Sequence, residues 1–526
     1  LEMLREKIPN IPFQMLLRGS NLVGYASYPD NLVRAFIAES AREGIDVFRV
    51  FDSLNWLPNM ETAMDEVLRQ GKFLEGTVCY TGDILDPTRD RYTLKYYVDF
   101  AKELERRGAH MLAIKDMSGL LKPYAAKKLV STLKQEIGIP IHLHTHNTTD
   151  NQIATYLMAA EAGVDVVDTA IGPLANLTSQ PSMNALVESL RGQERDTGFD
   201  PQRLQELADY WADVRLRYES FDKGLKVPVT DIYRYEIPGG QYTNLQPQVE
   251  SLGLGHRFAE VKEMYRTVNL MLGDIIKVTP SSKMVGDLAI FMVQNDLTPE
   301  NIVEKGEHLA FPDSVVSYFK GMMGQPPCGF PKDLQRVVLK GEKAINGRPG
   351  DLLPPVDWDQ LRSEIRKFYP NYEEPRSLIS FAMYPKVYEE YIRHRKEYGY
   401  IMRMGSHVFF NGMAVGEVNK INIEDGKTLM IKYIGLGDRN DDGTRNVQFE
   451  LNGMRREVSV PDPTATDSAK TVVMADPNDK SQAGASIPGM VSKVNVKPGD
   501  QVKVNDVLAV IEAMKMETSV VARMDG

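Results

Sequence analysis

Short apolar segments recur along the first third of the chain at intervals of about 30 residues, the length of a βαβ unit. Stretches with apolar residues at helical spacing lie between them. Because parallel strands need a crossover connection, this alternation predicts a parallel sheet built from right-handed βαβ units. The six expected strands are at residues 12–19, 46–52, 74–80, 110–116, 139–146 and 164–170.

Polar or charged residues stand at or near the ends of most of these strands. Such residues at the C-terminal ends of parallel strands are typical of a (β/α)8 barrel, which carries its chemistry at that face. An open doubly wound sheet would more often have a glycine-rich turn after its first strand. We therefore predict an α/β fold with a TIM barrel, and since a full barrel has eight strands, two are expected to precede Leu1. The residues at the strand ends are Arg18, Asp52, Lys115, His146 and Asp168.

Composition favours a soluble enzyme of small molecules. The 72 acidic and 62 basic residues give a net charge of -10, which argues against a nucleic-acid partner. Two cysteines, Cys79 and Cys328, cannot form a disulfide framework, and no apolar run approaches the roughly 20 residues that span a membrane. We expect a reducing, cytoplasmic location. A mitochondrial origin stays open, because the sequence starts at Leu1 rather than at methionine.

The rest of the chain divides by pattern. We predict an N-terminally truncated barrel at 1–200 and its mainly helical extension at 201–395. A small β domain follows at 396–460, with VFFNG, TLMIKYIG, VQFELNG and REVSV as its strands. Residues 461–486 are rich in Pro, Asp, Ser and Ala, which is typical of a flexible linker. Residues 487–526 read as short strands of a C-terminally truncated module.

Three histidines, His142, His144 and His146, alternate along one expected strand. A period of two points them to the same face, and Lys115 ends the neighbouring strand. Neutral imidazole is a common ligand of zinc and similar metals, and a lysine carboxylated by carbon dioxide would add an oxygen ligand. Two interpretations fit this pattern: a metal site completed by other strands, or hydrogen-bonded histidines inside the barrel.

Lys515 lies between Met514 and Met516, with apolar strands at 508–511 and 519–521. Methionines on both sides of one lysine are unusual in a solvated turn, although an exposed surface lysine is the simple alternative. The segment resembles the biotinyl carrier domain, whose EAMKM hairpin presents its lysine for biotin attachment. The resemblance implies covalent biotin on Lys515 and a biotin protein ligase as a partner.

Seven motifs occur in order: QMLLRGSNLVGY, FRVFDSLNW, AIKDMSG, HLHTHNT, TSQPSM, VTPSSKMVGD and EAMKMET. Together they resemble the carboxyltransferase and biotin carrier portion of the pyruvate carboxylase family. GKTLMIKYIG and GTRNVQFELNGMRREV resemble that family's central allosteric and tetramerisation region. The resemblance implies carboxyl transfer from carboxybiotin to pyruvate, giving oxaloacetate. It also implies a homotetramer and a biotin carboxylase domain or subunit as partner, since this sequence does not contain that ATP-dependent part.

The resemblance also implies a metal site. His144 and His146 match the family's histidine ligands, and Lys115 matches its carboxylated lysine. The expected metal is Zn2+ or Mn2+, and a fourth ligand, an aspartate, is expected on a strand that precedes Leu1.

Five further residues match the family's pocket for pyruvate and biotin. Arg18 matches an arginine that contacts pyruvate and the biotin site, with a salt bridge at the barrel mouth as the alternative. Thr279 matches a proton shuttle, with a helix cap as the alternative or as a second role. Tyr25, Ser282 and Lys283 match residues around biotin.

Two rival functions remain. An oxaloacetate decarboxylase α subunit or a transcarboxylase subunit would share the barrel, although such decarboxylases tend to lack the small β domain. A biotin-presenting assembly module without activity belongs to a different class.

Overall fold

The computed structural model describes the chain except residues 223–224, 400, 425, 463, 465–474, 477–478, 486–488 and 514–515. Lys515 and much of the expected linker therefore lie outside the described residues. Within the described residues, no helix is long and apolar enough to cross a lipid bilayer.

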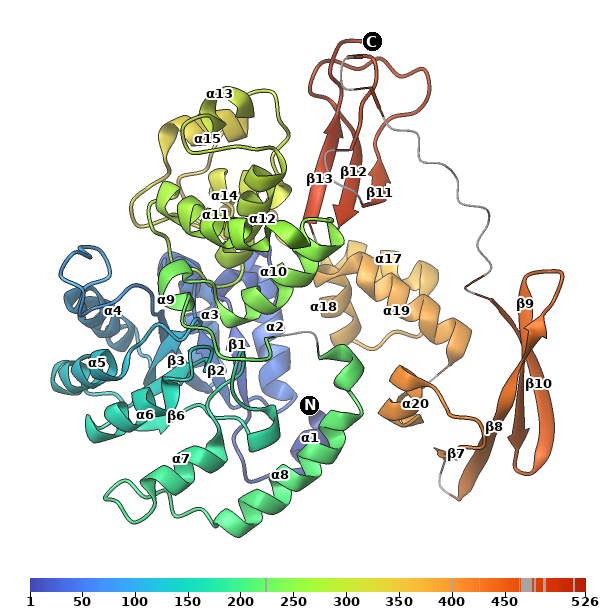
Figure 1. Cartoon of the computed structure of the whole chain (residues 1–526), viewed down its shortest axis with the longest axis horizontal. Coiled ribbons are helices and arrows are strands. Elements are labelled where there is room, and N and C mark those ends of the chain that lie inside the picture. Colours follow the sequence, from blue (N-terminus) through green and yellow to red (C-terminus); the bar gives the residue numbers. More distant parts are fainter. Residues whose placement is uncertain are drawn as a thin grey trace.

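A parallel sheet of six strands in sequential order forms the first part of the molecule (Figure 1). Five of the strands fall inside the segments expected from the sequence, and β3 begins one residue before its expected segment at 74–80. The sheet curves as half of a TIM barrel, as predicted. Its strands are β1 (Gln14–Leu17), β2 (Val47–Val50), β3 (Phe73–Cys79), β4 (Met111–Asp116), β5 (Ile141–Thr145) and β6 (Val166–Val167).

Helices connect these strands and cover the outer face of the sheet (Figure 1). They are α2 (Asp30–Arg42), α3 (Pro58–Arg69), α4 (Leu94–Arg106), α5 (Pro123–Glu136) and α6 (Gln152–Glu161), and α1 (Glu2–Lys7) precedes β1.

Helix α4 illustrates how the sequence sets this packing. The Thr93 hydroxyl accepts a hydrogen bond from the Tyr96 amide and caps the helix. The buried residues Tyr97, Ala101 and Leu104 recur at helical spacing and form its inner face. A Cβ atom on Gly76 of β3 would lie 3.2 Å from Leu104, so glycine permits this close approach of helix and strand.

The extension after the barrel is helical, as expected. Helix α12 is buried along most of its length and packs against α10, α11 and α14. Helix α7 (Met183–Leu190) follows β6 within the barrel region. The helices of the extension are α8 (Pro201–Leu216), α9 (Ile232–Tyr235), α10 (Gly239–Ser251), α11 (Phe258–Met271), α12 (Ser281–Gln294), α13 (Ile302–Gly306), α14 (Asp313–Phe319), α15 (Lys332–Leu339), α16 (Pro349–Leu352), α17 (Trp358–Phe368), α18 (Arg376–Met383) and α19 (Pro385–Tyr398).

One expected strand of the small β domain is wrong. The segment VFFNG lies in helix α20 (Ser406–Asn411), where the Phe410 ring packs edge-on against Tyr218 and Phe221. A short apolar run does not distinguish a strand from a helix, and here contacts with distant aromatic rings favour the helix. The antiparallel sheet consists of β7 (Val418–Glu424), β8 (Lys427–Arg439), β9 (Thr444–Leu451) and β10 (Met454–Pro461).

The C-terminal module is a three-stranded antiparallel sheet of β11 (Met490–Val494), β12 (Val507–Ala513) and β13 (Met516–Val521). Strand β13 lies against α14 of the helical extension (Figure 1). The buried side chain of Ile511 packs against Leu252, which directly follows α10. The module thus rests on the helices that follow the barrel.

Candidate active site

Strands β4 and β5 bring Lys115 and His144 side by side, because the two residues are register partners in the parallel sheet. The His144 and His146 rings follow on the same face, with centroids 5.1 Å apart. Lys115 is buried, and its ammonium group lies 5.0 Å from the centre of the Phe51 ring. Burial lowers the pKa of Lys115 to about 8, so a larger fraction of the amine is neutral than in water.

Both histidines are held as neutral imidazoles. Burial lowers the pKa of His144 to about 3 and that of His146 to about 4, and the charge of Lys115 adds to both shifts. His144 Nδ1 donates to Asp168 at 2.7 Å, and His146 Nδ1 donates to the Thr178 carbonyl at 2.7 Å. Each ring therefore presents the lone pair of Nε2, and His144 Nε2 is buried without a hydrogen-bond partner. Two such nitrogens suit a divalent metal.

His142 has a different environment, although it lies on the same strand face. Its Nδ1 contacts Glu75 at 2.5 Å and its Nε2 contacts Asp168 at 2.8 Å. Arg49 bridges the same two carboxylates. These residues form a charged layer inside the half-barrel. For His142, the predicted alternative, a hydrogen-bonded histidine inside the barrel, is therefore correct.

Asp168 connects that charged layer to His144. From the sequence alone, Asp168 was identified only as a polar residue at the end of an expected strand. It accepts hydrogen bonds from His142, His144 and Arg49. Burial alone would raise the pKa of this carboxyl, but the two histidine hydrogen bonds and the Arg49 charge hold it far below its ordinary range. Asp168 is therefore ionised and fixes the tautomer of His144.

A pocket of about 330 Å³ brings together three of the residues predicted around biotin and pyruvate. Tyr25 comes from the loop after β1, Thr279 from the segment just before α12, and Lys283 from the first turn of α12. The remaining lining residues, Gly240, Gln241, Asn244 and Gln248, are on α10 and belong to no motif recognised in the sequence.

The turn at the start of α10 connects this pocket to the histidines. Gly239 donates its amide to the Met117 carbonyl at 3.0 Å, and a Cβ on Gly239 would lie 3.0 Å from His146 Nδ1. The next residue, Gly240, lines the pocket. The absence of a side chain at Gly239 thus lets one turn contact His146 and form a wall of the pocket.

Arg18 and Ser282 lie beside this arrangement, and Arg18 has an unsatisfied donor. Arg18 Nε is buried without a hydrogen-bond partner, and burial lowers the guanidinium pKa. Among the described residues it forms no ion pair, so these residues give no support to the alternative of a salt bridge at the barrel mouth. Ser282 is buried in α12 and does not line the pocket, whereas Lys283 pairs with Asp287 at 2.6 Å.

Thr279 does not cap helix α12. The helix begins at Ser281, and the preceding residue Pro280 makes no side-chain capping bond. Thr279 instead lines the pocket.

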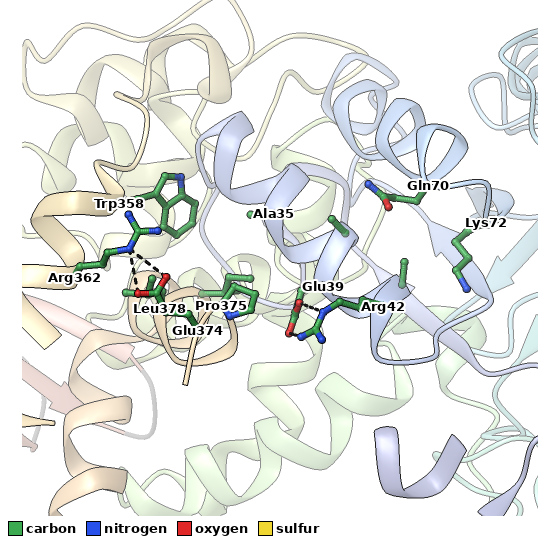
Figure 2. A pocket seen from close by; sticks show the side chains of 13 residues that line it. Ala35, Glu39, Arg42, Gln70, Lys72, Trp358, Arg362, Glu374, Pro375 and Leu378 are labelled. Atoms are coloured by element: carbon green, nitrogen blue, oxygen red, sulfur yellow. Dashed lines mark hydrogen bonds and ion pairs between the residues drawn. The ribbon is translucent and has the colours of Figure 1, made fainter. Parts of the chain in front are cut away.

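A larger cavity of about 710 Å³ lies elsewhere, between α2 and the helices α17 and α18 (Figure 2). Alanines form part of its wall. Its arginines are already paired, Arg42 with Glu39 and Arg362 with Glu374. None of the predicted site residues lines it, so the candidate site is the smaller pocket.

A solved structure of the carboxyl transferase domain from *Rhizobium etli* pyruvate carboxylase matches this chain with a TM-score of 0.85 and 47% identity, over 88% of this chain and 78% of that one. The chain belongs to the pyruvate carboxylase family. It corresponds to the carboxyltransferase portion of that family.

Other comparisons agree with the pyruvate carboxylase family over the whole chain. Pyruvate carboxylase of *Staphylococcus aureus* is 50% identical and the human mitochondrial enzyme 45% identical, each over 100% of this chain. The chain spans 46% and 45% of the length of these relatives. Three family models match: HMGL-like at residues 87–210, conserved carboxylase domain at 232–432 and biotin-requiring enzyme at 479–526.

Proposed function

We propose that this chain transfers a carboxyl group from carboxybiotin to pyruvate and so forms oxaloacetate. The relatives are named pyruvate carboxylase, and the *Rhizobium etli* domain has solved structures with pyruvate and biocytin. The observation that carries the proposal is the turn at Gly239 and Gly240, which joins the paired histidines to the pocket that contains Thr279.

The residues around His144 fit a divalent metal, Zn2+ or Mn2+. The buried, unpartnered Nε2 of His144 and the neutral ring of His146 offer two nitrogen ligands. Among the described residues, no three His, Cys, Asp or Glu side chains form a metal-binding group, and the Lys115 amine beside His144 is the further group that we propose as a ligand. A carbamate on its amine would supply the missing oxygen. A bound metal would stabilise the negative charge of the pyruvate enolate.

Protein groups perform the remaining chemistry. The unsatisfied Nε–H of Arg18 can donate to a pyruvate oxygen and stabilise developing charge. Pyruvate loses a methyl proton, and the ureido nitrogen of biotin gains one after carbon dioxide leaves. The Thr279 hydroxyl takes the first proton and delivers its own to that nitrogen, so the protons balance. Tyr25 and Lys283 hold the biotin ring in the pocket, and Ser282 supports them from α12.

The C-terminal module is the biotin carrier, with Lys515 as the attachment site for a biotin protein ligase. Strands β12 and β13 flank residues 514–515, and Ile511 packs against Leu252. Leu252 lies one helical turn beyond Gln248, which lines the pocket. The carrier therefore rests close to the site that its biotin would enter.

The rest of the organisation follows the family. We infer the barrel at 1–200, its extension at 201–395, the small β region at 396–460, the linker at 461–486 and the carrier at 487–526. A biotin carboxylase domain or subunit charges the biotin. The β sheet of the small region exposes Met430, Leu436 and Val458, which suits assembly of a homotetramer.

Decarboxylation of oxaloacetate by the intact enzyme with free biotin tests this proposal, with pyruvate as the product measured. Wild-type enzyme should form pyruvate, and Thr279→Ala should lower turnover by roughly 100-fold or more while metal content and biotinylation stay unchanged. Absence of pyruvate formation by the wild type would favour the assembly module. Near wild-type turnover of Thr279→Ala would remove Thr279 from the proton relay.

A further inference from the structure

A buried ion pair joins the two chain segments that lead into α10 and to Thr279. The Lys277 side chain is 1% exposed, and its ammonium group lies 2.9 Å from the Glu236 carboxylate. The same ammonium group donates to the Ile275 carbonyl at 3.1 Å and to the Thr81 hydroxyl at 3.3 Å. Lys277 thus ties its own segment to Glu236 and to the end of β3.

Glu236 is held from both sides. Arg89 donates to its second oxygen at 2.6 Å. Burial alone would raise the pKa of this carboxyl, but the charges of Lys277 and Arg89 lower it below its ordinary value. The backbone of Glu236 has a φ of 58°, a left-handed conformation that a non-glycine residue adopts at a cost. The ion pair therefore fixes the chain reversal between α9 and α10.

Each partner is close in sequence to a residue of the pocket wall. Thr279 follows Lys277 by two residues, and Gly240 follows Glu236 by four. A second anchor restrains the Thr279 segment, because the buried Ser281 hydroxyl lies within hydrogen-bonding distance of the Ile276 and Ser53 carbonyls. Neither Lys277 nor Glu236 lines the pocket itself. Lys277 and Glu236 must therefore act on the pocket through the backbone segments that they hold in place.

We propose that the Glu236–Lys277 ion pair is a positioning device that sets Thr279 against the α10 wall of the pocket for proton transfer. This inference rests on the proposed function, in which Thr279 relays the proton. A proton relay depends steeply on geometry, since a misplacement of about 1 Å can cost roughly 100-fold in rate. Substrate binding depends less on the Thr279 hydroxyl, so the pair should act on kcat rather than on KM for pyruvate.

Steady-state kinetics of Lys277→Met in the intact, biotinylated enzyme test the inference. Methionine keeps the length of the side chain and removes its charge. We expect kcat to fall at least about 10-fold, with KM for pyruvate and metal content unchanged. Lys262→Met is the matched control, because it removes a lysine that pairs with Asp231 at 2.6 Å outside the pocket wall. Its kcat should stay within about two-fold of wild type.

A double-mutant cycle separates positioning from general stability. If Lys277 acts through Thr279, Lys277→Met should cause no further loss of kcat in the Thr279→Ala background. Additive losses, or an unchanged kcat of Lys277→Met, would overturn the inference. A fully active Thr279→Ala variant would instead refute the proposed relay, so the two failures are distinguishable. Should Lys277→Met not fold, Glu236→Asp keeps the charge, withdraws the carboxylate by one methylene and must show the same kinetic pattern.

Discussion

The Asp168 carboxylate lies 2.7 Å from His144 Nδ1 and accepts a hydrogen bond from it, while the opposite nitrogen of that ring is buried without a partner. A carboxylate behind an imidazole fixes the ring orientation and increases the basicity of the free nitrogen. Asp168 also binds Arg49 of the charged layer inside the half-barrel. The orientation of the candidate metal ligand is thereby coupled to the interior of the sheet.

Replacing Asp168 with asparagine should weaken metal binding about 10-fold to 100-fold, because the amide orients and polarises His144 less well. Metal content after dialysis against graded chelator concentrations measures the effect independently of activity. Asp165→Asn is the control, since Asp165 pairs with Lys134 at the surface. Equal metal retention in both variants would contradict the role of Asp168.

A methyl group at Gly239 should disturb His146. The added Cβ would stand 3.0 Å from His146 Nδ1 and 3.3 Å from the Thr178 backbone, so the ring or the turn has to move. We expect Gly239→Ala to lower both metal affinity and kcat, as judged by metal analysis and by the decarboxylation assay. Gly240→Ala offers a matched comparison, because no atom lies within 4 Å of a Cβ placed there. Similar behaviour of the two variants would contradict the close contact.

Features of the fold that have a local sequence pattern could be predicted, whereas features that depend on contacts with distant residues could not. The six strands were predictable because buried parallel strands read as apolar runs between helices. The strand expected at VFFNG is wrong because its apolar residues contact Tyr218 and Phe221. A local sequence pattern carries no information about such distant contacts.

The site shows the same limit. His144 and Lys115 were predictable, since their strands are neighbours in the chain. Gln241 and Gln248 of α10 were not, because a polar helix face that lines a pocket has the same sequence pattern as one that faces water. The Glu236–Lys277 pair joins residues of two loops, and only the folded chain brings such residues together.

Arginine at position 515 should abolish biotinylation, because it keeps the positive charge but lacks the primary amine that is acylated. The intact protein, produced together with a biotin ligase, should bind avidin as wild type and lose that binding as Lys515→Arg. Lys503→Arg, a change in the same module, should retain it. Avidin binding by Lys515→Arg would place the biotin on another lysine.

Glu236 should make the stability of the protein depend on pH. Its pKa is lowered in the folded state, so the stabilisation is complete above the ordinary carboxyl pKa of 4.5 and is lost as the pH falls through the lowered value. Near pH 7, Glu236→Gln should lower the free energy of unfolding by about 3 kcal/mol, because it leaves the buried Lys277 without its partner. Denaturant unfolding of both proteins should show this difference shrinking below pH 4.5. A difference that stays constant from neutral to acid pH would contradict the ion pair.

The contact between Ile511 and Leu252 should matter only when biotin is delivered on its carrier. Leu252→Asp places a charge against the buried Ile511 side chain and should weaken docking of the carrier beside the pocket. We expect the ATP-driven carboxylation of pyruvate by the intact enzyme to fall about 10-fold, because the introduced charge would have to lie against the apolar Ile511 side chain. Decarboxylation of oxaloacetate with free biotin needs no carrier and should be unchanged.

Leu270→Asp, at a position that is 53% exposed, should affect neither reaction. Equal loss of both activities in Leu252→Asp would mean that Leu252 supports the fold of α10, and no loss of the coupled reaction would mean that the carrier delivers biotin from another position.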